Sequence, residues 1–175
     1  MRDNFNNRQK SFSASSKPQQ GGGGQRGLGG GRPSPQQGAG SQLQVIEKIL
    51  AGDGAAIVQK ASELAYAIKG LKAAQLRNFY GSALLIEEKT RSGGLRPQDF
   101  INKIQLLRPK LHYMVNRPQG YHARPLQEFL DQLIPETAKQ VTQMVQGQSG
   151  DWRGVAEAFF DFLEAVVAYH KEGGA

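Results

Sequence analysis

Only two groups of side chains in this sequence resemble catalytic machinery. One is a set of three histidines: His112, His122 and His170. No two of them have the spacing with which one helix face binds a metal ion, and the chain has no cysteine for a thiolate site or a nucleophile. A metal-free ribonuclease pairing His122 with Lys110 is conceivable, but no further residue supports it. We therefore predict no metal, no cofactor and no enzyme activity.

The second group consists of three carboxylates near the C-terminus: Glu157, Asp161 and Glu164. Their spacing places them on one narrow stripe of a helix. A carboxylate metal site built from helices needs a histidine or a second acidic helix, and neither is evident. We expect a solvated acidic ridge.

The charge of the chain is divided unevenly along its length. The net charge is +7 and the sequence pI about 9.8, which favours an anionic partner. Residues 60–124 contain twelve basic and four acidic residues, whereas residues 125–175 contain three basic and eight acidic ones. Charge alone does not distinguish RNA from DNA, a membrane surface or an acidic protein.

Three of the central cations form a regular series. Lys103, Lys110 and Arg117 are seven residues apart, so on a helix they form a row with roughly 10 Å between neighbours. Such a row can follow a phosphate backbone, and it can equally be a solvated helix flank. His112 and Tyr113 lie close to it and could stack on a base, although such a tyrosine is more often half-buried core.

The elements that position these residues are predicted to be helices throughout, because no stretch alternates with period two. We expect an all-α fold, a compact bundle of five to six helices, with helical segments over residues 43–51, 55–68, 72–90, 97–115, 126–144 and 152–171. Pro109 should kink the fourth segment or split it at Arg108, and Pro135 should mark a second kink or restart. Gly81 lies inside the third segment, where we expect the close approach of a neighbouring helix. Leu84 and Leu85 of that segment are predicted to face inward.

The last segment organises the bundle. Its apolar residues recur at three- and four-residue steps over more than half of the helix circumference, which predicts a helix buried against several neighbours. Asp151 is the expected N-cap, and Gly173 and Gly174 should stop the helix. Tyr169 and His170 are expected to have structural roles.

Residues 1–41 differ from the rest in composition. They are rich in Gly, Gln, Ser, Asn and Pro, and carry a net charge of +5. This tail contains too little apolar surface to offset the entropy of ordering, so we expect a disordered basic tail before a single helical-bundle domain at residues 42–175. The chain has no apolar signal core, and the absence of cysteine fits a reducing compartment, so we expect a cytoplasmic protein.

Three segments resemble a known family. Residues 71–80, 106–113 and 159–171, followed by Gly173 and Gly174, are similar in order and spacing to the small helical subunit of the Csm complex, the type III-A CRISPR effector. The resemblance covers roughly residues 43–174, and the last segment is the most specific. The Gly/Gln-rich tail departs from the family pattern.

The resemblance implies a non-catalytic subunit that stacks head to tail in several copies. The stack would run beside the backbone subunits, along the duplex of guide RNA and target RNA, in contact with the other Csm subunits and with no membrane. Together with the charge pattern, it indicates the residues expected to contact RNA phosphates: Lys69, Lys72, Arg77, Lys103, Arg108, Lys110 and Arg117. The alternatives are a free-standing helical RNA-binding or chaperone-like protein, a type III-B small subunit, and a helical nuclease.

Overall fold

Helix α7 (Trp152–Glu172) is the central element of the bundle. It packs against α1 (Gln36–Leu50), α2 (Gly54–Ala67), α3 (Ala73–Arg91) and α6 (Arg124–Gly147). Its apolar face is buried as predicted, with Phe159 and Phe162 fully inaccessible to solvent. The backbone N–H of Arg153 donates to Asp151 Oδ1 at 3.0 Å, which confirms the predicted cap.

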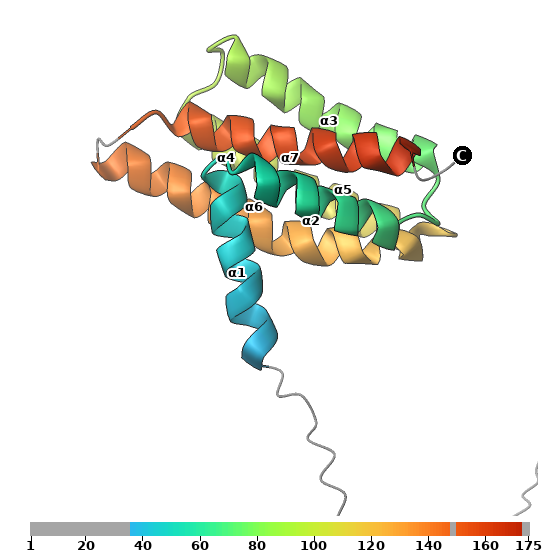
Figure 1. Cartoon of the computed structure of the whole chain (residues 1–175). Helices are drawn as coiled ribbons and strands as arrows, with labels where there is room; N and C mark the ends of the chain where they lie inside the picture. Colours follow the sequence, from blue (N-terminus) through green and yellow to red (C-terminus); the bar gives the residue numbers. More distant parts are fainter. Residues whose placement is uncertain (1–35, 148–149, 173–175) are drawn as a thin grey trace, which may run out of the picture. The chain divides into compact units, whose positions relative to one another are not determined.

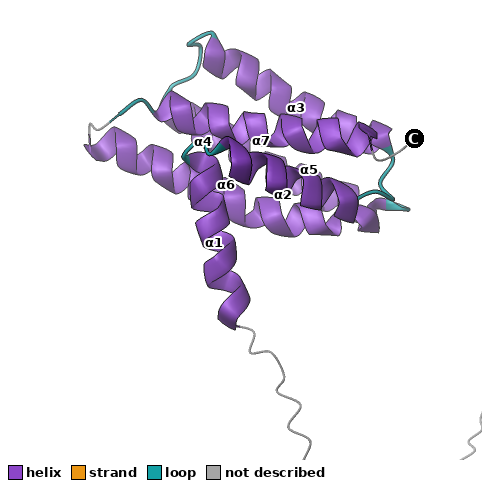
Figure 2. Cartoon of the chain, viewed as in Figure 1, coloured by secondary structure: helices purple, strands orange, loops and turns teal. Residues whose placement is uncertain are grey.

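The computed structural model describes residues 36–147 and 150–172, and all of their regular structure is helical (Figures 1 and 2). The remaining helices are α4 (Pro97–Gln105), α5 (Leu107–Val115) and the short 3₁₀ helix η1 (Gly120–Ala123). Counting α4 and α5 as one broken helix gives six α-helices among the described residues, within the predicted five to six. Of the predicted tail, residues 1–35 lie outside the described residues, as do Gly173 and Gly174.

The first helix begins earlier than predicted. It starts at Gln36 rather than at residue 43, so residues 36–41, which we assigned to the tail, are helical. Its last turns are anchored in the core by Ile46, Ile49 and Leu50, and it crosses α2 and α7 at a steep angle (Figure 1). A helix anchored at one end propagates at low cost, which offsets the poor helix propensity of Gly38 and Gly40.

The predicted split near Pro109 occurs, but at a different residue, and the predicted restart at Pro135 does not occur. The break between α4 and α5 lies at Leu106, two residues before the predicted split at Arg108. Pro109 thereby becomes the third residue of α5, in the first turn, where a missing N–H costs no intrahelical hydrogen bond. Helix α6 continues through Pro135 without the restart that we predicted.

Two predictions for α3 are wrong. Leu84 and Leu85 face solvent, with exposed fractions of 47% and 62%, while Ile86 and Glu87 are buried. A Cβ atom added at Gly81 would meet nothing within 4 Å, so no neighbouring helix approaches there. The inward face of α3 is therefore rotated toward Ile86, because α3 packs against α7 on one side and against α4 and α5 on the other.

No helix of the described residues is long and apolar enough to cross a membrane.

Candidate nucleic-acid interface

Two adjoining grooves run along the surface between α3 and the broken helix α4–α5. The first has a volume of about 160 Å³ and lies between α3 and α5, with Lys110 and Arg117 on one wall. The second has a volume of about 240 Å³ and is surrounded by Lys89, Lys103 and Lys110. Since Lys110 and Ser82 line both, we treat them as one feature, the basic groove.

The predicted row of cations lies along the basic groove. Lys103 and Lys110 line the second groove, and Lys110 and Arg117 line the first. The helix break at Leu106 separates Lys103 from the other two in secondary structure, but the three still follow one wall. Within residues 36–147 and 150–172, no ion pair involves Lys89, Lys103 or Lys110, so their charges remain available to an anion.

Large apolar side chains are exposed along the same groove. Leu85, Leu106 and Tyr113 are each more than 60% exposed and line it. Tyr113 is therefore a surface residue rather than the half-buried core residue considered above. The Arg117 guanidinium lies over its ring, 4.7 Å from the ring centre.

Lys89 is a groove residue that the sequence analysis missed. It lies one turn after Leu85 and two turns after Ser82, all on the wall formed by α3. The signal was present as Ser82, Leu85 and Lys89 at three- and four-residue steps. It was hidden by the assumption that Leu85 faces the core.

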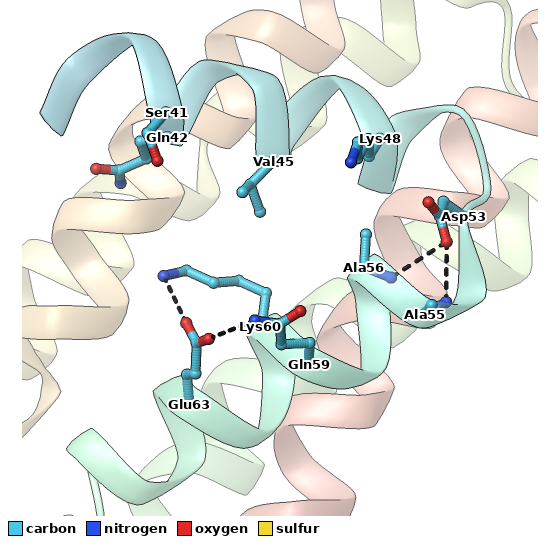
Figure 3. A pocket seen from close by; sticks show the side chains of 10 residues that line it. All are labelled: Ser41, Gln42, Val45, Lys48, Asp53, Ala55, Ala56, Gln59, Lys60 and Glu63. Carbon is cyan, nitrogen blue, oxygen red and sulfur yellow. Dashed lines mark hydrogen bonds and ion pairs between the residues drawn. The ribbon is translucent and has the colours of Figure 1, made fainter. Parts of the chain in front are cut away.

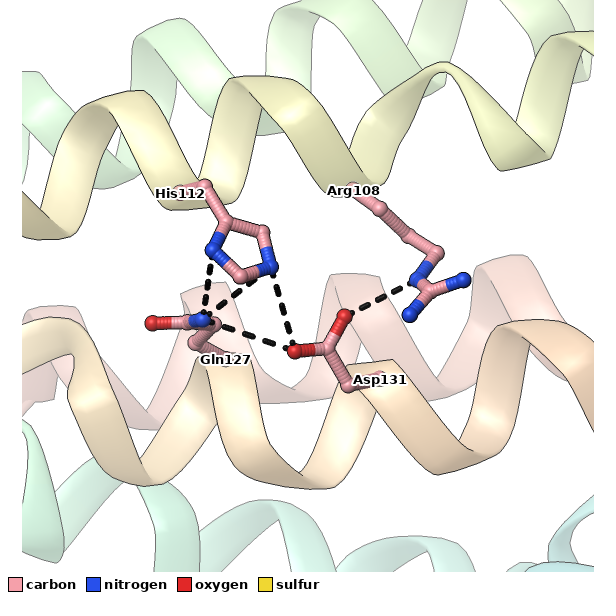
Figure 4. A network of polar contacts seen from close by, with 4 residues as sticks. All are labelled: Arg108, His112, Gln127 and Asp131. Atoms are coloured by element: carbon pink, nitrogen blue, oxygen red, sulfur yellow. Dashed lines mark hydrogen bonds and ion pairs between the residues drawn. The ribbon is translucent and has the colours of Figure 1, made fainter.

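Arg108 has a partner within the protein. Its Nε donates to Asp131 Oδ1 of α6 at 2.9 Å, and the same carboxylate lies 3.4 Å from His112 Nε2 (Figure 4). Gln127 Nε2 lies within 3.0–3.2 Å of the two ring nitrogens of His112 and 3.4 Å from Asp131 Oδ2. This network ties α5 to α6, so His112 and Arg108 turn toward α6 while Tyr113 lines the groove with α3.

The other three predicted cations lie near the connection between α2 and α3. Lys69 Nζ lies 4.5 Å from the ring centre of Tyr66, Lys72 is the exposed N-cap residue of α3, and Arg77 Nε donates to the Ala73 carbonyl at 3.3 Å. None of them is among the residues that line the basic groove. Their contact with RNA stays a prediction.

Glu157, Asp161 and Glu164 of α7 are exposed, as expected of a solvated ridge. Asp161 and Glu164 lie near Glu87 of α3, whose side chain is only 7% exposed and pairs with Arg91 at 2.9 Å. Burial raises the pKa of Glu87, Arg91 opposes the rise, and the charges of Glu164 and Asp161 add to it. No group of three or more His, Cys, Asp or Glu side chains with metal-binding geometry occurs in the part of the chain that the structure describes.

A larger groove, of about 470 Å³, lies between α1 and α2 (Figure 3). Its charges are balanced, because Lys48 and Lys60 are accompanied by Asp53 and Glu63. Lys60 is 3.2 Å from Glu63, and Asp53 caps α2 by accepting from two backbone N–H groups. This groove therefore attracts an anion less than the basic groove does.

The family model described as Csm2 Type III-A matches residues 51–175, which include both walls of the basic groove and all of α7. Neither the search of curated proteins nor that of solved structures gave a match.

Proposed function

The chain belongs to the Csm2 type III-A family, the small subunits of type III-A CRISPR Csm complexes, and from this premise we propose that it binds RNA within the complex. In this proposal the basic groove contacts the sugar-phosphate backbone of the guide–target duplex. The subunit is a non-catalytic binding module in which base pairing supplies the sequence specificity.

The observation that carries the proposal is the concentration, in the basic groove, of cations that form no ion pair with any other described residue. Lys89, Lys103 and Lys110 surround one groove, and Arg117 extends the series into the next. A flexible lysine binds phosphate as a point charge and releases condensed counterions from the duplex. Contacts of this kind give affinity but carry no sequence information.

The distribution of charge also supports stacking between copies. The exposed ridge of Glu157, Asp161 and Glu164 on α7 is negative and lies outside the basic groove, so it can meet a cation of the next copy while the groove holds RNA. A surface patch that meets a different patch on the next copy generates a head-to-tail array. Each copy touches few phosphates, so the array multiplies weak contacts along one RNA. Other Csm subunits complete the assembly.

The test is a charge-removal variant in the assembled complex. We expect K103A/K110A/R117A to weaken target-RNA binding by the same factor for every guide sequence. The salt dependence of log K should become shallower by about 2–3 for each copy in contact with the duplex, because three phosphate contacts are lost.

A second triple variant provides the matched control. K48A/K139A/K171A removes the same charge from exposed lysines of α1, α6 and α7, away from the basic groove. It should leave affinity and salt slope close to those of the wild type. Equal effects of the two variants, or no effect of the first in a complex that assembles normally, would exclude the basic groove as the RNA contact.

A further inference from the structure

The half of the basic groove between α3 and α5 contains more than phosphate ligands. We propose that it binds one unpaired base of the RNA. Tyr113 and Arg117 form the stacking surface, and the side-chain amides of α3 that line the groove contact the edge of the base. This base pocket rests on the proposed RNA-binding function and adds to it a preference for a nucleotide that has left the duplex.

The first argument is the pair of planar side chains on which a base can stack, which we call the platform. Tyr113 is 63% exposed and the Arg117 guanidinium lies 4.7 Å from its ring centre, so two planar groups lie together at the groove wall. Proteins stack splayed-out bases on aromatic rings and on guanidinium planes.

The second argument is the opposite wall. Gln75 and Asn78 of α3 line the groove across from Tyr113, and each carboxamide offers both donors and an acceptor. Among the described residues, no hydrogen-bond donor satisfies the buried Gln75 Oε1. An unsatisfied buried acceptor costs free energy, and an N–H group of a bound base can remove that cost when the amide turns toward the groove. Since an amide can rotate to match different edges, we expect little preference among the four bases.

The third argument is the size and lining of the groove. Its volume of about 160 Å³ is below the range of roughly 300–1,000 Å³ typical of pockets that enclose drug-sized ligands, so it suits one planar ring rather than a whole nucleotide. Phe79 and Met114, each 6% exposed, form its apolar floor. Lys110 and Arg117 can then hold the phosphates that flank the base.

A paired base cannot enter such a pocket. In an A-form duplex the bases are stacked inside, and the grooves present phosphates, 2′-hydroxyls and base edges. A base must leave the stack to reach the Tyr113 ring, so the occupant has to be an unpaired nucleotide. The positive rim also suits an acidic peptide, which the experiment must distinguish from RNA.

The experiment measures binding of the isotope-labelled full chain to two RNAs by NMR titration at low salt, which remains quantitative at millimolar affinity. One RNA is a short blunt duplex, and the other is the same duplex with a single unpaired nucleotide. We expect the bulged RNA to bind about 5- to 150-fold more tightly, which is the range of one base–aromatic stacking contact.

The variants assign that preference to the platform. Tyr113→Ala should abolish the preference, so that the bulged and blunt RNAs bind with equal affinity, and Tyr113→Phe should retain it, because the ring and not the hydroxyl stacks. Tyr121→Ala is the control, since Tyr121 is 62% exposed but lies on η1, outside the groove.

Two outcomes would overturn the inference. Equal affinity for both RNAs, with blunt-duplex binding still weakened by K103A/K110A/R117A, leaves the proposed function intact and removes the base pocket. Displacement of the bulged RNA by an acidic peptide whose own binding requires Tyr113 assigns the groove to a protein partner. Absence of binding to either RNA, by contrast, counts against the proposed function itself.

Discussion

Replacement of Phe162 by alanine tests whether α7 is the centre of the fold. Phe162 is fully buried, and its ring centre lies 5.2 Å from that of Phe129 on α6, which is 1% exposed. The substitution removes most of a large side chain from a site enclosed by well-packed neighbours. Phe→Ala substitutions in cores cost about 3–5 kcal/mol, through lost transfer free energy and the cavity that remains.

The aromatic pair places the expected loss in the upper part of that range. A tilted aromatic pair contributes about 0.5–1.5 kcal/mol beyond the area it buries, and this term is lost as well. For a domain of this size, the change corresponds to a melting temperature lower by roughly 10–20 °C.

The assay is urea denaturation followed by circular dichroism at 222 nm. The midpoint should fall while the m-value is unchanged, because the unfolding reaction exposes nearly the same surface. Tyr66→Ala is the control: Tyr66 is 72% exposed on α2 and should cost less than about 1 kcal/mol. A Phe162→Ala variant within about 1 kcal/mol of the wild type would refute the central role of α7.

Three further substitutions follow from local geometry. Gly120→Ala should destabilise the protein by several kcal/mol in the same assay, because its Cβ would overlap the Met114 carbonyl oxygen. Gly81→Ala should stabilise the protein by about 0.5–1 kcal/mol, because its Cβ meets open space in a helix. A reversed order of the two stabilities would contradict the packing described. Glu87→Gln should become more stable relative to the wild type as the pH rises above 4.5. The pKa of Glu87 is raised in the folded state, so protonated Glu87 contributes to the stability of the wild type below pH 4.5, and this contribution is lost as the carboxyl group ionises. That difference, measured by urea denaturation at pH 4–8, should then level off; a constant difference would mean that Arg91 fully compensates the buried charge.

The sequence predicted best where one helix carries its own signal. The buried face of α7 follows from its three- and four-residue steps alone, and Asp151 was recognised as its cap from residue type and position. The seven-residue spacing of Lys103, Lys110 and Arg117 similarly predicted a row along one wall.

The errors arose where tertiary packing or proline chemistry decides. Leu84 and Leu85 are apolar yet exposed, because the sides on which α7 and α4–α5 pack set the inward face of α3. The helix break lies at Leu106 rather than at the predicted Arg108, because Pro109 is tolerated in the first turn of α5. A single sequence also does not show which residues of α3 oppose α5, so Lys89 and Gln75 were not among the predicted site residues.

The most direct measurement of the central claim is site-resolved photo-cross-linking of target RNA within the assembled Csm complex. Target RNA carrying photoreactive uridines is irradiated, and the adducts on this subunit are located by peptide mass spectrometry. If the basic groove contacts the RNA, the adducts should be concentrated on α3 around Ser82 to Lys89 and on the stretch from Lys103 to Arg117. Adducts confined to the acidic ridge of α7 or to the outer surface of α6, with none along the groove, would contradict it.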